Sequence, residues 1–398
     1  MPETVLGIDF GTSCTSAGTL VGDKVELVRD NSDPVIPTVV YVPERGELEV
    51  GRRAVLAQQS HPNRVVRSVK RILGLAPTDE LVRRYAAGAS AKLDTSGDKL
   101  MFKLGAQAYA PEQVAAAVLG RVRDLAEQRF GGTIKKCVIT LSAAADAGYR
   151  EAIVRAAKIA HLDVVELVAE PIAGALAVGL HATSAQRRLL VLDFGGGTFD
   201  ASAIVQSGMR FTPAATFGDP MLGGDDLDDA FAEAIAGAVH RQYGADMHRD
   251  ILKWAELRYR CEQTKRQLSV RTETQFTMSE AFIANGRPRS LDLRIDRPWV
   301  EERWRPLFDR ALDVVDEVLT RAGWRPEGVD AVALIGGTAL VPKFQQLVAA
   351  KFGRDRVTVS PDADLAVAMG AALLTVRHGG TARNVPVLGA TSDLAAAR

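Results

Sequence analysis

The sequence has 398 residues, which predicts two or three domains, and 47% of them are hydrophobic, enough to bury a sizeable core. Its 49 basic residues balance its 49 acidic residues, which argues against a dedicated binder of nucleic acid or of anionic membranes. Three widely spaced cysteines, an N-terminus without a signal-peptide pattern and the lack of a long apolar run predict a cytoplasmic protein without a disulfide framework.

Strands and helices alternate in the first half of the chain. Residues 4–10 predict a short buried strand, and residues 16–28 predict a hairpin that turns at Gly22 and Asp23. Residues 51–75 have a mostly helical pattern. The other expected elements are strands over residues 38–42, 135–142 and 163–168 and helices from Pro111, Ala147 and Glu170.

The pattern then restarts, because residues 188–206 repeat strand, turn and strand, and Asp193 lies about half a chain length after Asp9. This internal repeat predicts two similar α/β halves: lobe I over residues 1–185 and lobe II over residues 186–378. We expect the last helix, about residues 362–378, to pack back onto lobe I. The expected elements of the second half are helices around residues 227–243, 254–268, 299–322 and from Pro342, a strand over residues 331–337, and a flexible tail over residues 379–398.

Two matching loops carry the chemistry that the repeat predicts. GIDFGTSCTS (Gly7–Ser16) and VLDFGGGTFD (Val191–Asp200) each place glycines after a strand and an aspartate, so that backbone N–H groups can approach a phosphate. The aspartates make sense if a hard cation lies between them and the phosphates. A lone glycine triplet is most often a simple turn. The paired copy favours a two-sided clamp on a nucleotide.

A further glycine pair, in ALIGGTALVP (Ala333–Pro342), ends a strand and opens a helix, a place that binds anions or packs against purine rings. Taken alone, it is equally well a tight turn. The sequence contains no GxxxxGK[ST] motif, which excludes a P-loop nucleotide hydrolase.

These motifs resemble the phosphate-1, phosphate-2 and adenosine motifs of the actin, sugar kinase and heat shock protein 70 superfamily, and residues 169–179 and 364–373 are similar to its two connecting helices. The resemblance is strongest to the ATPase domain of heat shock protein 70. It implies an α/β, actin-like ATPase fold with two duplicated RNase H-like lobes around a nucleotide cleft. The segments similar to that domain in particular are Ser68–Gly74, Thr216–Asp229 and Cys261–Ser269.

The resemblance implies that ATP or ADP and Mg²⁺ are the cofactors, with K⁺ as an optional further cation. Asp9 and Asp193 would hold Mg²⁺ through waters, and Glu170 would be a third acid of the metal site that senses the γ-phosphate. From the residues alone, Glu170 is an acid in the first turn of a helix, before Pro171. The implied metal residues are therefore Asp9, Asp193 and Glu170.

The resemblance implies that Lys70 is a catalytic residue, which would reach the γ-phosphate and the attacking water. The residues alone place Lys70 on a basic helix face, which is ordinarily solvated. Thr198 and Asp200 would flank the γ-phosphate, with Asp200 orienting the water and helping to accept its proton. The implied catalytic set is Lys70, Glu170, Asp193, Thr198 and Asp200.

One helix face of the second half carries four polar residues at i, i+3, i+4 and i+7: Glu262, Lys265, Arg266 and Ser269. On its own, this spacing indicates no more than a Glu–Arg surface pair. By resemblance they bracket ribose and adenine. The implied nucleotide-binding residues are Gly11, Thr12, Ser13, Gly195, Gly196, Gly197, Thr198, Gly223, Gly224, Glu262, Lys265, Arg266, Ser269, Gly336, Gly337, Thr338 and Asp364, and Arg150 resembles an arginine that links nucleotide state to substrate-domain docking.

The chain departs from the family pattern at three places. Ser142 stands where the family usually has proline, and Leu340 stands where it has an arginine over the adenine. No acidic-leucine linker and no β-rich peptide-binding domain follow in this sequence. We therefore expect an ATPase domain without a substrate-binding domain, either as part of a longer protein or as a stand-alone homologue.

The leading hypothesis is slow hydrolysis of Mg-ATP as a conformational switch of the chaperone type, read by a protein partner or an exchange factor. One alternative is a small-molecule kinase of the same fold, although the sequence shows no sugar-kinase acceptor motif. Another alternative is non-catalytic: a nucleotide-sensing scaffold or an actin-like filament protein. No nucleic acid and no membrane is expected as a partner.

Overall fold

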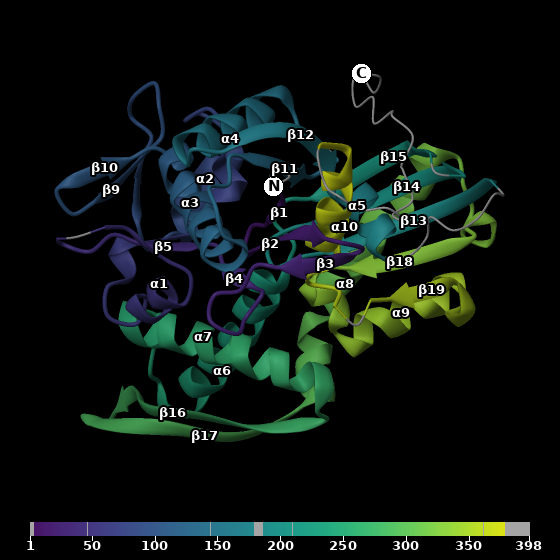
Figure 1. Cartoon of the computed structure of the whole chain (residues 1–398). Coiled ribbons are helices and arrows are strands. Elements are labelled where there is room, and N and C mark those ends of the chain that lie inside the picture. The colour runs from purple at the N-terminus through teal and green to yellow at the C-terminus, as the bar shows by residue number, and fades with distance from the viewer. Residues whose placement is uncertain are drawn as a thin grey trace.

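The computed structural model describes residues 4–378 except residues 46, 144, 179–185, 209 and 361. Two mixed sheets form its centre (Figure 1). The first sheet has the strand order β12-β11-β1-β2-β3, with β4 paired to β2. Its strands are β1 (Val5–Phe10), β2 (Cys14–Val21), β3 (Lys24–Leu27), β4 (Ile36–Pro37), β11 (Lys136–Leu141) and β12 (Asp163–Ala169).

The second sheet repeats this topology strand for strand. Its order is β19-β18-β13-β14-β15. β13 runs parallel to β18 and antiparallel to β14, as β1 runs parallel to β11 and antiparallel to β2. The strands are β13 (Gln186–Phe194), β14 (Phe199–Ser207), β15 (Arg210–Asp219), β18 (Ala331–Ile335) and β19 (Val357–Val359). The predicted α/β, actin-like fold is confirmed, and we keep the names lobe I and lobe II for the two predicted halves.

Two short helices, α5 (Glu170–Ala177) and α10 (Ala366–Leu374), lie between the two sheets and contact each other (Figure 1). One apolar cluster joins them to side chains of both sheets. Their backbones approach so closely that a Cβ atom on Gly370 would lie 1.9 Å from the carbonyl oxygen of Ala173. Small residues are therefore required where the two lobes meet.

The outer helices cover the sheets and close the two main cores. In lobe I, α3 (Pro111–Phe130) and α4 (Ala147–Ile159) pack on each other and on the first sheet. In lobe II, α8 (Arg297–Ala322) packs on β14 and β15, and α9 (Pro342–Phe352) packs on β19. Among the described residues, no helix is long and apolar enough to cross a bilayer.

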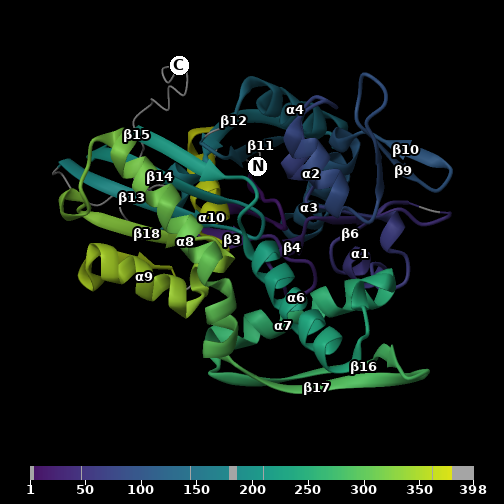
Figure 2. The same ribbon diagram turned by 180° about the vertical axis from the view of Figure 1, so that it is seen from behind.

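Each lobe also carries a smaller part. Figures 1 and 2 show α6 and α7 of lobe II beside α1 of lobe I, with β16 and β17 on the side of α6 and α7 that faces away from the central sheets. In lobe II, a two-stranded sheet packs beneath the helix pair. The elements are α6 (Gly224–Tyr243), α7 (Ile251–Val270), β16 (Glu273–Ala284) and β17 (Arg287–Asp296) in lobe II, and α1 (Arg52–Ala57), α2 (Glu80–Gly88), β5 (Val39–Tyr41), β6 (Glu49–Val50), β7 (Val65–Arg67), β8 (Lys92–Asp94), β9 (Met101–Leu104) and β10 (Gln107–Tyr109) in lobe I.

The helical prediction for residues 51–75 is wrong for most of that stretch. After α1 the chain forms only 3₁₀ turns, at Pro62–Arg64 and Val69–Ile72, with β7 between them. The β-branched pair Val65 and Val66 is buried as part of a sheet with β5, and this tertiary pairing outweighs the helical pattern. The predicted tail, residues 379–398, lies outside the described residues.

Candidate functional site

The two predicted phosphate loops occupy equivalent positions in the two sheets. Residues 11–13 connect β1 to β2, and residues 195–198 connect β13 to β14. Asp9 pairs with Ser16 across the first turn, and Asp193 pairs with Asp200 across the second. The duplicated topology therefore places two aspartates at equivalent ends of the sheets, each next to a glycine-containing loop.

The two loops are in direct contact. A Cβ atom on Gly196 would lie 2.4 Å from Ser13 Oγ, and one on Gly197 would lie 2.3 Å from Thr12 Cγ2. Glycine is therefore needed at both positions, since any side chain would push the loops apart. The backbone of lobe II meets the hydroxyl side chains of lobe I at this point.

Three neighbouring groups hold the second loop in place. The N-terminus of α6 donates to it, from Gly224 N to Gly195 O at 3.1 Å and from Asp225 N to Gly196 O at 2.7 Å. Thr338 Oγ1 also donates to Gly195 O at 2.8 Å. These bonds engage loop carbonyls. Gly195 N donates to Thr198 O at 3.1 Å within the loop, so the N–H groups of Gly196 and Gly197 are the candidates for an anion.

The glycine pair of the third motif lies at the end of β18, beside the second loop. Gly336 has φ 83, a left-handed conformation that favours glycine. A Cβ atom there would lie 2.6 Å from Asp193 Oδ1. The turn therefore comes close to the acid of lobe II, and Gly337–Leu340 continue as a short 3₁₀ helix.

One face of α7 forms the opposite wall. Lys265 Nζ donates to Gly224 O at 2.6 Å and pairs with Asp228 Oδ2 at 2.7 Å, both in α6. Arg266 pairs with Glu262 at 2.9 Å on the same face, as the i, i+4 spacing predicts. Burial raises the pKa of Asp228 to about 7, against the lowering effect of Lys265.

These elements enclose one cavity of about 520 Å³, within the usual range of roughly 300–1,000 Å³ for small-molecule sites. Two predicted residues do not line it: Gly223 packs behind the second loop, and Asp200 lies next to β11. The predicted residues that do line it are Asp9, Gly11, Thr12, Ser13, Lys70, Glu170, Asp193, Gly195, Gly196, Gly197, Thr198, Gly224, Glu262, Lys265, Arg266, Ser269, Gly336, Gly337, Thr338 and Asp364.

The acids of the cavity repel one another. Burial, followed by the charge of Glu170, raises the pKa of Asp9 to about 7. The same two causes, together with Asp9, raise the pKa of Asp193 well above its ordinary value. Among the described residues, no three or more acidic, histidine or cysteine side chains are arranged to bind a metal directly. A hydrated cation fits this acid set, because it would offset the repulsion and reach the acids through waters.

Lys70 lies at the lobe I wall, where Nζ pairs with Glu170 Oε1 at 2.6 Å. Only 11% and 7% of the two side chains are exposed. Burial is the largest single effect and would lower the pKa of Lys70, but Glu170, Tyr149 and Asp9 together outweigh it and raise that pKa. Lys70 therefore stays a fixed positive charge beside the phosphate loops.

The comparisons with known proteins agree with this geometry. The family model described as "Hsp70 protein" matches residues 5–391. The chain belongs to the heat shock protein 70 family. The chain is 31% identical over 396 residues to the protein called "Chaperone protein DnaK" from Stenotrophomonas maltophilia (strain R551-3), a match that covers 97% of this chain and 62% of that relative. The chain thus spans under two thirds of the length of this curated heat shock protein 70 relative.

The structure also shows polar partners that sequence reasoning missed. Thr140 Oγ1 donates to Asp9 Oδ1 at 3.2 Å, and Ser142 Oγ donates to Asp200 Oδ1 at 3.0 Å. The hydroxyl of Tyr149 is buried near Lys70 without a hydrogen-bond partner among the described residues. Thr140 lies beside Asp9 because β11 pairs with β1, and the hydroxyl residues at the end of the predicted strand over residues 135–142 were the available signal.

The heat shock protein 70 departure at Leu340 leaves an apolar patch at the mouth of the cavity. Val35, Val270 and Val341 line the cavity with Leu340, and the Val270 side chain is 83% exposed. Arg266 is a positively charged side chain that also lines the cavity. Arg150, in contrast, lies in α4, where Nε donates to Ala145 O at 3.1 Å, and it does not line the cavity.

Proposed function

We propose that this chain binds Mg-ATP in the cavity between its lobes and hydrolyses it slowly, using lobe closure as a switch. The observation that carries the proposal is the contact of Thr12 and Ser13 with Gly196 and Gly197. The two loops, each part of one copy of the duplicated sheet, meet at one cavity wall, and each is preceded by a partly buried aspartate. This arrangement supports a clamp on polyphosphate from both sides.

The acids Asp9, Asp193 and Glu170 are the candidates to hold Mg²⁺, which when bound would neutralise charge on the phosphates. Loop N–H groups and the hydroxyl of Thr12 would donate to phosphate oxygens, while Ser13 Oγ donates to Asp225. The Gly336–Gly337 turn and the α7 face would bracket the nucleoside, with the apolar patch around Leu340 against the base. The nucleotide would therefore lie with its phosphates at the acids and its base at the mouth of the cavity.

Hydrolysis would depend on Lys70, which lines the cavity, and on Asp200, which does not line it and would act through a water. Lys70 is a buried cation beside the loops and would stabilise charge that develops on the γ-phosphate. Burial, followed by the charge of Glu170, raises the pKa of Asp200 to about 6, and Ser142 counteracts this rise. A carboxylate with such a pKa is mostly ionised at neutral pH and can orient a water and accept its proton.

The chaperone role, a protein partner or exchange factor that reads the switch, and a cytoplasmic location are proposals that rest on family membership. The name of the similar protein, "Chaperone protein DnaK", supports the first of them. A filament or a small-molecule kinase of the same fold has no specific observation in its favour.

Single-turnover hydrolysis with Lys70→Ala tests the catalytic part of this proposal. We expect the variant to bind Mg-ATP but to lose hydrolysis by about 10²-fold or more, because a preorganised charge is removed. Lys158→Ala, an exposed lysine of α4, is the matched control and should hydrolyse ATP like the wild type. Equal hydrolysis in the Lys70 and Lys158 variants would refute the role of Lys70.

A further inference from the structure

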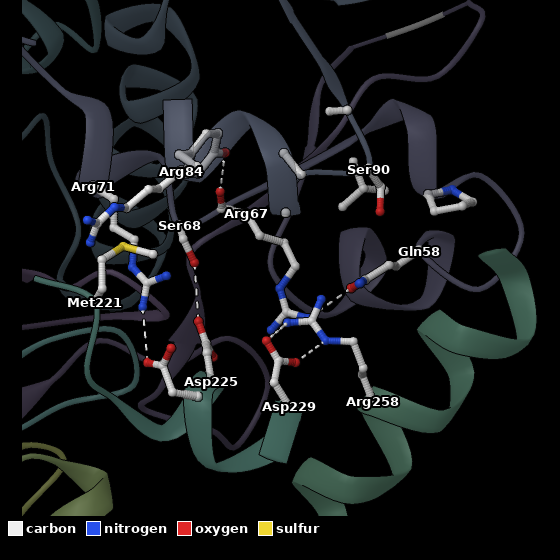
Figure 3. Close-up of a pocket in the computed structure, with 17 residues that line it drawn as sticks. Gln58, Arg67, Ser68, Arg71, Arg84, Ser90, Met221, Asp225, Asp229 and Arg258 are labelled. Carbon is white, nitrogen blue, oxygen red and sulfur yellow. Dashed lines mark hydrogen bonds and ion pairs between the residues drawn. The ribbon is translucent and has the colours of Figure 1, made fainter. Parts of the chain in front are cut away.

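A second cavity, of about 170 Å³, lies between the lobes next to the nucleotide cavity (Figure 3). Its lobe I wall includes Arg67, Ser68 and Arg71, from the segment that carries Lys70, and its lobe II wall includes the first turns of α6. Asp225, the second residue of α6, lines both cavities. This carboxylate is therefore part of the partition between them.

Asp225 connects two separate segments of lobe I. Its Oδ2 accepts from Ser13 Oγ at 3.2 Å and from Ser68 Oγ at 3.3 Å. Ser13 belongs to the first phosphate loop, and Ser68 lies two residues before Lys70. Figure 3 shows Ser68 pointing toward Asp225 across the gap between the lobes. One carboxylate oxygen thus ties the phosphate loop and the lysine segment of lobe I to lobe II.

Ser68 holds an uncommon backbone conformation at this contact. Its φ of 52 lies in the left-handed region, which costs a residue with a side chain more than it costs glycine. This conformation starts the short 3₁₀ turn Val69–Ile72, which includes Lys70. The hydrogen bond to Asp225 therefore fixes the residue that sets the direction of the lysine segment.

Arg71 makes a second connection from the same segment. Its Nη2 donates to Gly197 O at 2.6 Å, in the second phosphate loop, and lies 3.5 Å from Asp226 Oδ2. The residue after Lys70 thus orients a carbonyl of the lobe II loop. Asp225 holds the same loop from the other side, through its backbone N–H to Gly196 O.

The charge of Asp225 suits this role. Burial is the largest single effect and would raise its pKa, but the charges of Arg67, Arg71, Lys265 and Arg258 together outweigh burial, and the pKa is lowered. The carboxylate therefore stays ionised and accepts both serine hydroxyls as charge-assisted hydrogen bonds, which are stronger than neutral ones.

We propose that Asp225 and Arg71 are positioning residues that align the two phosphate loops and the Lys70 segment when the lobes are closed. The inference rests on the proposed function, since these residues would act on hydrolysis only through Ser13, Lys70 and Gly197. Neither residue needs to touch the nucleotide. A small displacement of aligned groups lowers the rate of a reaction far more than it lowers affinity.

The matched control lies in the same cavity, one turn further along α6. Asp229 pairs with Arg258 of α7, with Arg258 Nη2 at 2.9 Å from Asp229 Oδ2. This pair lies within lobe II, and among the described residues neither member hydrogen-bonds a phosphate loop. Asp229→Ala thus removes a carboxylate from the cavity and leaves the hydrogen bonds of Asp225 and Arg71 in place.

The experiment measures single-turnover hydrolysis at saturating Mg-ATP and the Kd of Mg-ADP by calorimetry, for Asp225→Ala, Arg71→Ala and Asp229→Ala. We expect the first two variants to lose about tenfold in hydrolysis while Kd changes by less than about threefold, and Asp229→Ala to match the wild type. Arg71→Lys, which can still donate to Gly197 O, should recover part of the rate.

A double-mutant cycle separates positioning from general damage to the fold. Ser68→Ala should lower the rate in the wild-type background and change nothing in Asp225→Ala, because their hydrogen bond is then already absent. If Asp225→Ala does not fold, Asp225→Asn carries the test: it keeps one carbonyl oxygen and loses the charge, and we expect an intermediate rate.

The outcomes distinguish the two proposals. Hydrolysis at the wild-type rate in both Asp225→Ala and Arg71→Ala would overturn the positioning role and leave the proposed function intact. Additive effects of Ser68→Ala and Asp225→Ala would also overturn it. Absence of nucleotide binding in the wild-type protein would instead refute the proposed function itself.

Discussion

At the scale of single residues, Ser142 shows how one departure from the family pattern acts on the site. Its hydroxyl bonds Asp200, so lobe I contacts the candidate water-orienting acid of lobe II through a side chain that proline lacks. Sequence reasoning identified the acids because the repeat pairs Asp9 with Asp193. It missed the partner of Asp200, since the two residues lie 58 positions apart and belong to different lobes.

We expect Ser142→Ala to lower single-turnover hydrolysis about three- to tenfold without changing nucleotide affinity, because Asp200 loses the bond that orients it. Ser207→Ala, an exposed serine on the same strand as Asp200, is the control. Hydrolysis rates from quenched-flow experiments and nucleotide Kd values from calorimetry are compared between the two variants and the wild type. An unchanged rate in Ser142→Ala would show that Asp200 needs no orientation from lobe I.

At the scale of elements, the repeat allowed the central strands and most helices to be predicted, whereas the smaller parts were harder. The glycine loops, the strand before each loop and the amphipathic α3 follow local patterns. The turns after α1 do not, because Val65 and Val66 pair with β5, far away along the chain. The β16–β17 hairpin was also missed, although buried Phe276 and Met278 alternate with exposed residues along β16, the pattern typical of a strand with one buried face.

The contact of α5 with α10 makes a specific prediction for stability. Gly370→Ala would place a Cβ atom against the backbone of Ala173, so we expect the free energy of unfolding to fall by about 3 kcal/mol. Gly120→Ala in α3 meets no atom within 4 Å outside its own helix, and it should raise stability by about 0.5–1 kcal/mol. Chemical denaturation of both variants checks the pair, and equal stabilities would contradict the close approach.

At the scale of the whole molecule, two lobes with the same strand order meet at α5, α10 and the two phosphate loops. The cavity between them collects residues from positions 9 to 367, so no local pattern could show that they share one site. The internal repeat supplied that link, because two equivalent loops in a duplicated fold face each other. The connections through Asp225 and Arg71 depend on side-chain geometry across the lobes, which only the structure shows.

Calorimetric titration of Mg-ATP into the wild type, Asp9→Asn and Asp23→Asn tests the central claim most directly. Asp9 is a partly buried acid that lines the cavity, and Asp23 is an exposed acid at the turn after β2. We predict saturable binding of one nucleotide per chain in the wild type and in Asp23→Asn. Binding should weaken about tenfold or more in Asp9→Asn or when a chelator removes Mg²⁺. The account would be contradicted if the folded wild type bound no nucleotide, or if neither the chelator nor Asp9→Asn changed its affinity.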